Sequence, residues 1–136
     1  MNNIDLKNRL AIVTGGAQGF GYSITKRFLE SGARVIIWDI DKKFIDSASK
    51  ELNSDKLQSQ IVDVTNFQEV EEKFKEIIKN NKVDIFVNNA GIAGQNEKVW
   101  NYSNEEWHKV INLDLNAVFY CCKIIVPHMI KNNYGR

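Results

Sequence analysis

The most informative segment of the sequence is TGGAQGFG, at residues 14–21. It follows the apolar run 9–14 and overlaps the start of residues 19–31, where apolar side chains recur at the spacing of a helix. A glycine-rich turn between a strand and a helix exposes backbone N–H groups and the positive end of the helix dipole, and both attract phosphate. The segment therefore indicates a phosphate-binding turn near the start of an α/β domain.

Three known glycine motifs can be compared with this segment. A GxGxxG dinucleotide motif fails, because Gly19 and Gly21 are followed by Ile24 where the third glycine would stand. A Walker A motif fails, because Tyr22 occupies the position of its lysine. The pattern TGxxxGxG, which begins at Thr14, fits at every defined position. A glycine-rich turn that only packs a helix against a strand is a further interpretation, so other features are needed.

The rest of the chain alternates short apolar runs with longer segments of helical periodicity. We expect strands at residues 9–14, 34–38, 57–62 and 83–87. Helices are expected at residues 19–31, from 42 onward, from 65 to 80 and from 103 to 131, with capping boxes of Thr65 with Gln68 and of Ser103 with Glu106. The expected fold is α/β: a Rossmann-type doubly wound parallel sheet with three α/β/α layers, one domain over residues 1–136, truncated before strand five.

Polar or small residues follow each of the last three expected strands. Asp39 lies 18 residues beyond Gly21, a spacing at which an acidic residue accepts hydrogen bonds from an adenosine ribose, although surface aspartates end strands as often. Asp63 and Val64 follow the third strand, and Asn-Asn-Ala-Gly follows the fourth at residues 88–91. Because the carboxyl ends of parallel strands share one edge of the sheet, these residues predict a ligand site there.

Taken together, these residues resemble the classical short-chain dehydrogenase/reductase family, and the resemblance extends over the whole chain. Further matches lie in the long final helix, at Trp107, Val118, Phe119 and the tripeptide Pro127-His128-Met129. Enzymes of that family transfer a hydride between a nicotinamide cofactor and a small-molecule alcohol or carbonyl substrate. The resemblance implies that this chain is the N-terminal, cofactor-binding half of such an oxidoreductase, with 3-oxoacyl groups among the candidate substrates.

The resemblance also implies a role for each motif. It places the pyrophosphate at Gly15, Gly19 and Gly21, the adenosine ribose at Asp39, and the adenine at Asp63 and Val64. Residues 88–91 would form the end of the central strand and an edge of the cofactor site. The full set of expected cofactor-binding residues is Gly15, Gln18, Gly19, Phe20, Gly21, Asp39, Ile40, Asp63, Val64, Asn89, Ala90 and Gly91. The expected cofactor is NAD, because the charge of Asp39 would repel the 2′-phosphate of NADP.

The chain departs from the family pattern in two places. Asp114 occupies the position where the family usually has a catalytic asparagine, so it is the catalytic candidate in this chain. The family's catalytic serine and its Tyr-x-x-x-Lys pair would follow a fifth strand, beyond Arg136. Tyr22 and Lys26 have the same spacing, but they lie one turn into the expected phosphate-binding helix and are not expected to be catalytic. We therefore expect an enzyme family, but no activity from the 136-residue chain alone.

Two other functions are alternatives to an oxidoreductase. The first is a non-catalytic dinucleotide-binding or sensor module that works as it stands. The second is a flavodoxin-like or receiver domain, which is disfavoured because neither explains Asp39 together with the Asn-Asn-Ala-Gly segment at residues 88–91.

The composition restricts the partners. The chain has 18 Lys and Arg residues against 17 Asp and Glu residues and no basic stripe, so no nucleic-acid partner is expected. It has no run of 18 apolar residues and lacks the basic and apolar stretches of a signal peptide at its start, so we expect a cytoplasmic location and no membrane. His108 and His128 have no ligand partners at helical spacing, so no metal is expected.

The final helix carries more apolar residues than a single sheet-facing stripe requires. Those between residues 110 and 126 are Val110, Ile111, Leu113, Leu115, Val118, Phe119, Ile124, Ile125 and Val126. Such a helix is either deeply buried or pairs with another subunit, and in the resembled family it packs against its counterpart. We therefore expect a homodimer or homotetramer.

Overall fold

Strand β1, Leu10–Thr14, lies inside the sheet, and all five of its residues are buried. In the computed structural model, which describes residues 4–136, β1 pairs in parallel with β2 (Arg34–Asp39) on one side and with β4 (Ile85–Val87) on the other. β3 (Leu57–Ile61) pairs in parallel with the outer edge of β2. Continuous apolar runs such as β1 and β2 are typical of parallel strands that are covered on both faces.

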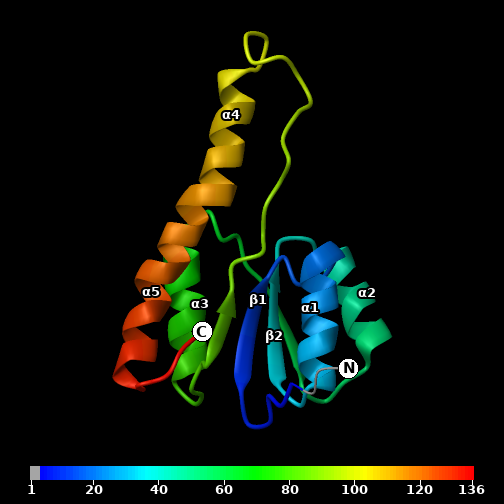
Figure 1. Cartoon of the computed structure of the whole chain (residues 1–136), viewed down its shortest axis with the longest axis vertical. Coiled ribbons are helices and arrows are strands. Elements are labelled where there is room, and N and C mark those ends of the chain that lie inside the picture. Colours follow the sequence, from blue (N-terminus) through cyan, green and yellow to red (C-terminus); the bar gives the residue numbers. More distant parts are fainter. Residues whose placement is uncertain (1–3) are drawn as a thin grey trace.

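Helices cover both faces of this sheet, so the expected three-layer, Rossmann-type α/β fold is confirmed (Figure 1). α1 (Gly19–Glu30) and α2 (Lys42–Leu52) lie on one face, whereas α3 (Phe67–Ile78) lies on the other. The strand order is β3-β2-β1-β4, so the order reverses between β1 and β4. Open α/β sheets bind ligands at the carboxyl ends of the strands beside such a reversal.

The final helical run is interrupted. It consists of α4 (Asn104–Ile111), a π-helical segment at Asn112–Asn116 and α5 (Ala117–Lys131), and α5 packs beside α3. The sequence analysis predicted one continuous helix, with a kink or weakened turn only at Pro127, and missed the π-helical segment. Within residues 4–136 this run, Asn104–Lys131, is the one helix long and apolar enough to cross a membrane by length and composition, a test that core helices of soluble proteins also pass.

The predicted capping box of Thr65 with Gln68 is wrong. α3 is capped instead by Asn66, whose Oδ1 accepts a hydrogen bond from Glu69 N at 3.2 Å. Thr65 cannot take this role because its hydroxyl donates to Asp63 Oδ1 at 2.7 Å, in the turn that follows β3. The cap therefore moves one residue along the chain, and Thr65 helps to orient Asp63.

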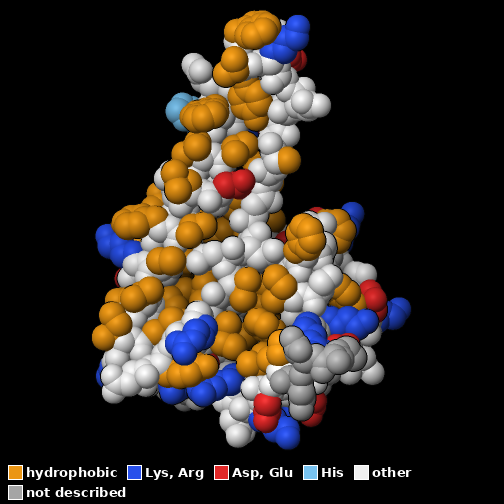
Figure 2. All heavy atoms as spheres, viewed as in Figure 1, with side chains coloured by type: hydrophobic (Ala, Val, Ile, Leu, Met, Phe, Trp, Pro, Cys, Tyr) orange, Lys and Arg blue, Asp and Glu red, His pale blue; other side chains and the backbone are white. Residues whose placement is uncertain are grey.

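The apolar side chains of α5 are only partly buried. Ala117, Cys121 and Ile125 face the core, whereas Phe119 and Ile130 are 60% and 70% exposed. Figure 2 shows hydrophobic side chains gathered along this helix. Within residues 4–136 the helix is therefore not deeply buried, and one apolar side of it faces outward.

The last residue of the chain pairs with the outer edge of β4. Phe86 N donates to Arg136 O at 2.9 Å, and Arg136 N donates to Asp84 O at 3.0 Å, which is the pattern of a parallel pair. The ring of Tyr134 supports this approach, because the guanidinium carbon of Arg9 lies 3.8 Å from its centroid. The outer edge of β4 is therefore able to take a further parallel strand.

Asp84 ties the starts of β1 and β4 together, and its loss should destabilise the sheet. Its buried carboxylate accepts from Arg9 Nη1 and from Leu10 N, both at 3.0 Å. In Asp84→Ala both donors lose this acceptor, and we expect about 2 kcal/mol less stability in urea denaturation. The matched control, Asp46→Ala, removes an exposed ion pair with Lys42 and should cost less than about 0.5 kcal/mol. Equal losses for the two variants would contradict this role.

Candidate functional site

The hydroxyl of Thr14 joins the carboxyl ends of β1 and β4. Its Oγ1 donates to Val87 O at 3.1 Å and accepts from Asn89 N and Ala90 N, both at 3.0 Å. The side chain of Asn89 adds two bonds between the same segments, because its Nδ2 donates to Thr14 O at 2.9 Å and to Gly15 O at 3.2 Å. These bonds fix the start of the glycine-rich turn against the segment that follows β4.

The glycine-rich turn leaves room at the N-terminus of α1. Gly15 and Gly19 have φ angles of +59° and +56°, a region that L side chains rarely adopt. A Cβ placed on Gly21 would overlap Gly15 O, so this glycine lets α1 pack closely on the turn. A Cβ on Gly19 would meet no atom within 4 Å, so the backbone there faces open space.

The N-terminus of α1 has no side-chain cap. Gln18 is the N-cap residue and makes no capping hydrogen bond, and the first turn contains no acidic residue. By contrast, Asp41, Asn66 and Ser103 each cap their own helix with a side-chain oxygen. The first N–H groups of α1 and its dipole are therefore available to an anionic ligand.

Asp39 stands beside this turn, at the carboxyl end of β2. Its carboxylate is held on both sides, because Oδ2 accepts from Ala17 N at 3.3 Å and Oδ1 accepts from Asp41 N at 3.1 Å. The residue is 6% exposed, whereas the neighbouring Ile40 is mostly exposed. The structure thus orients an acceptor at the edge of the glycine-rich turn.

Asp63 occupies the corresponding position after β3. Its Oδ1 accepts from Thr65 N at 2.9 Å and from Thr65 Oγ1 at 2.7 Å, and its own N–H donates to Glu69 Oε1 at 3.2 Å. Val64, the next residue, is buried. The end of β3 therefore presents a fixed carboxylate next to an apolar wall.

These strand ends enclose a cavity of about 320 Å³. Eight of the residues expected from the sequence line it, namely Gly15, Gln18, Asp39, Ile40, Asp63, Val64, Ala90 and Gly91. The sequence analysis did not assign five further lining residues, which are Trp38, Val62, Thr65, Ile92 and Leu113. Leu113 had no sequence signal, since only the tertiary fold brings the π-helical segment over the strand ends.

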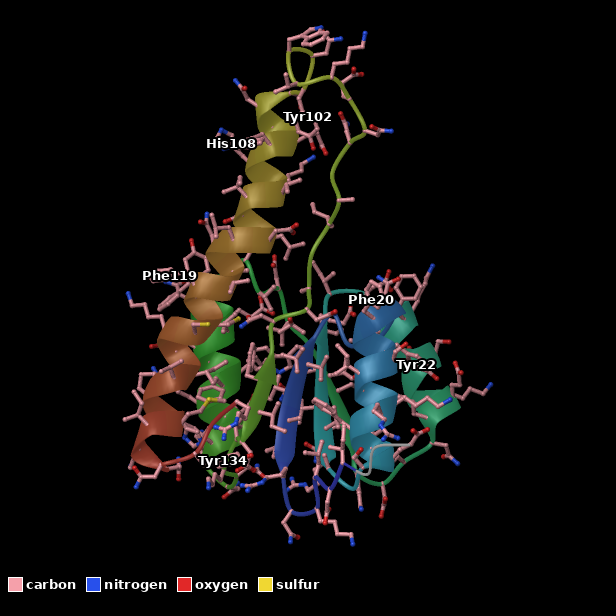
Figure 3. The ribbon with its side chains drawn as sticks, viewed as in Figure 1. Phe20, Tyr22, Tyr102, His108, Phe119 and Tyr134 are labelled. Carbon is pink, nitrogen blue, oxygen red and sulfur yellow. The ribbon has the colours of Figure 1, made fainter. Side chains whose placement is uncertain are left out.

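Four expected residues lie outside the cavity lining. Gly21 and Asn89 both pack against Gly15 O in the glycine-rich turn, and Gly19 is the turn residue that faces open space. Phe20 is 87% exposed on the first turn of α1 (Figure 3). Thr14, which the sequence analysis quoted as part of TGxxxGxG but did not assign to the site, carries the hydrogen bonds that organise it.

Asp114 reaches the segment that follows β4. Its Oδ1 accepts from Ile92 N at 3.0 Å. A Cβ on Gly91 would lie 3.3 Å from the same oxygen, so a glycine there leaves room for the carboxylate. The residue is exposed and belongs to the π-helical segment, a type of turn that is frequent at functional sites.

Tyr22 and Lys26 lie elsewhere. They line a separate hollow between α1 and α2, together with Glu51. The hydrogen bond of Tyr22 to the Glu51 carboxylate raises the pKa of the phenol above its ordinary value. The structure places this pair away from the cavity at the strand ends, and Figure 3 shows Tyr22 on the flank of α1.

The arrangement fits a dinucleotide. The open turn at Gly19 and the uncapped α1 N-terminus suit a pyrophosphate, and the carboxylate of Asp39 can accept from two neighbouring ribose hydroxyls. Val64, Ala90 and Leu113 offer apolar surface for a base. Within residues 4–136 no group of three or more His, Cys, Asp or Glu side chains is arranged to hold a metal ion.

The chain matches known proteins over most of its length. The family model described as short chain dehydrogenase matches residues 9–136. A curated relative, 2-dehydro-3-deoxy-L-rhamnonate dehydrogenase (NAD(+)) from Sphingomonas sp. (strain SKA58), is 34% identical over 129 residues, which cover 94% of this chain and 51% of the relative.

Two solved structures show the same fold. The 3-ketoacyl-(acyl-carrier-protein) reductase from Brucella melitensis complexed with NADH has a TM-score of 0.88 and 29% identity, over 94% of this chain and 53% of its own. The closed form of serine dehydrogenase complexed with NADP+ has a TM-score of 0.87 and 31% identity, over 93% of this chain and 51% of its own. The chain thus spans about half the length of the proteins it matches. Because the family model covers residues 9–136, this chain belongs to the short-chain dehydrogenase family.

Proposed function

We propose that this chain forms the NAD-binding part of a short-chain oxidoreductase that acts on an alcohol or ketone. One observation carries the proposal: the buried carboxylate of Asp39 lies beside an uncapped helix N-terminus, in a cavity at the strand ends. A bound nicotinamide dinucleotide would accept the hydride from an alcohol in its oxidised form, or donate it to a ketone in its reduced form. The part of the chain described here would bind the dinucleotide and orient it, with Thr14 and Asn89 holding the turn in place.

The choice of NAD over NADP follows from the charges around Asp39. A 2′-phosphate on the ribose would approach this carboxylate, and at about 4 Å with an effective dielectric near 20 each pair of unit charges repels by roughly 4 kcal/mol. Lys42 offers little compensation, because its Nζ lies 2.6 Å from Asp46 Oδ2, whereas Lys43, the next residue, can reduce the repulsion. Relaxation and salt reduce the repulsion but do not change its sign.

We expect the chain to bind NAD at least about tenfold more tightly than NADP, a difference of about 1.4 kcal/mol in calorimetry. In Asp39→Asn the preference for NAD over NADP should become smaller, because the charge that repels the 2′-phosphate is lost while an acceptor oxygen for the ribose stays. The control Glu76→Gln removes an exposed carboxylate on α3, outside the cavity, and should leave the preference unchanged. Equal affinities of the unmodified chain for the two cofactors would contradict the proposal.

The 136-residue chain by itself should not turn over substrate. The residues that line the cavity include no Tyr, Lys, His or Cys, so no side chain there is suited to donate the proton that accompanies hydride transfer. A positioned general acid or base contributes about 10²–10⁴-fold to such a rate. We expect no oxidation of NADH above the buffer rate with a panel of ketones and 3-oxoacyl thioesters, under conditions where NADH binding is measured directly. Turnover by the chain alone would reveal a catalytic site outside the cavity.

A non-catalytic dinucleotide-binding or sensor module is the second candidate. A cavity lining without Tyr, Lys, His or Cys is as compatible with this module as with the cofactor-binding part of an oxidoreductase. The two candidates differ in what the gene encodes beyond codon 136. A serine followed by a Tyr-x-x-x-Lys pair would support the oxidoreductase. A stop codon at that point would support the module.

We also propose that the outward side of α5 associates with a second copy of the chain. Val118 is half-buried and lines a small hollow together with Thr14 and Asn88, whereas Phe119 is exposed, so Phe119 is the informative position. We expect Phe119→Asp to shift the protein to monomers in sedimentation experiments. The control Val99→Asp changes an equally apolar exposed residue away from α5 and should not. The same sedimentation for Phe119→Asp and the unmodified chain would contradict this interface.

A further inference from the structure

The one hydrogen bond that the Asp114 side chain accepts does not require a negative charge. Oδ1 accepts from Ile92 N at 3.0 Å, and an asparagine at this position would provide the same acceptor. Among residues 4–136 no Lys, Arg or His side chain forms an ion pair with Asp114, and its Oδ2 has no hydrogen-bond partner there. A negative charge therefore stands uncompensated beside residues 91 and 92.

The topology places this charge at a particular end of the proposed dinucleotide. The strand order reverses between β1 and β4, and a dinucleotide lies across that crevice with its pyrophosphate at the first helix. Asp39 is the last residue of β2 and Asp63 follows β3, so the adenosine half extends to that side. The other half must extend over β4, toward Gly91 and the carboxylate of Asp114.

The two redox forms of the cofactor differ in charge only at that end. The nicotinamide ring is a cation in NAD+ and neutral in NADH, whereas the adenosine half and the pyrophosphate are the same in both forms. A carboxylate beside the ring therefore attracts one form and not the other. The carboxylates of Asp39 and Asp63, at the adenosine end, act almost equally on both forms.

We propose that Asp114 is a specificity-determining residue that makes the site bind NAD+ more tightly, relative to NADH, than an asparagine would. The inference rests on the proposed NAD site and adds to it a selection between redox states. The hydrogen bond to Ile92 N keeps the carboxylate directed at the segment after β4, and the glycine at position 91 leaves the space between them.

The test measures the dissociation constants of NAD+ and NADH for the 136-residue chain, by calorimetry and by NADH fluorescence. In Asp114→Asn the ratio of the NADH dissociation constant to the NAD+ dissociation constant should fall by roughly three- to tenfold, as expected when one partly solvated unit charge near the ring is removed. The fall should come from weaker NAD+ binding. Asp39→Asn is the matched control, because it removes a charge at the adenosine end and should leave this ratio unchanged.

A second measurement varies the ionic strength. Salt screens an exposed charge, so raising the ionic strength should lower the same ratio in the unmodified chain and have a smaller effect on it in Asp114→Asn. The thermal unfolding of Asp114→Asn should match that of the unmodified chain, since the acceptor for Ile92 N is retained. A ratio that stays within twofold in Asp114→Asn, or that does not respond to salt, would overturn the selection by Asp114 while leaving the NAD site intact. Failure of the unmodified chain to bind either form would overturn both.

Discussion

The buried hydroxyl of Thr14 is the contact on which the site depends. It bonds to the end of β4 and to the first two N–H groups after Asn88, and Asn89 returns two bonds to the end of β1. Parallel strands alone would leave these two strand ends free to separate, because their ladder stops before the turn begins. The side-chain bonds continue the connection past the ladder. They therefore set the position of the glycine-rich turn relative to the rest of the cavity.

The charges of the cavity are arranged in a simple order. The uncapped N-terminus of α1 is the positive centre, and the carboxylates of Asp39 and Asp63 lie on the side of β2 and β3. No Lys or Arg lines the cavity, so the attraction for phosphate comes from backbone N–H groups and the helix dipole. A triphosphate site ordinarily adds a lysine to this arrangement, as in the Walker A motif, and Tyr22 stands at that position here.

The two edges of the sheet, at β3 and at β4, differ in how far other parts of the chain cover them. On the β3 side, α2 covers the strands, and the turns after β2 and β3 are held by hydrogen bonds to the carboxylates of Asp39 and Asp63. On the β4 side, a single residue pairs with the strand edge, and α5 exposes Phe119 and Ile130. The same side carries Asp114 and its uncompensated charge. The adenosine end of the proposed site is thus built entirely within this chain, whereas the substrate end borders on surfaces that further protein can cover.

Local sequence patterns were sufficient to predict the sheet and the edge at which the candidate cavity lies. The apolar run of β1, the glycines of residues 14–21 and the aspartates after β2 and β3 act through backbone conformation and strand polarity, which a sequence records directly. The bonding of Thr14 to residues 73 and more positions away, the π-helical segment and the cap at Asn66 were not predictable in this way. Each depends on which groups lie close together in the folded chain. Thr65 does not cap α3 because its hydroxyl donates to Asp63. Leu113 lines the cavity because its helical segment crosses the strand ends. The sequence by itself determined the fold class and predicted the edge of the sheet that carries the candidate site, while the tertiary structure decided which side chains hold that edge in place.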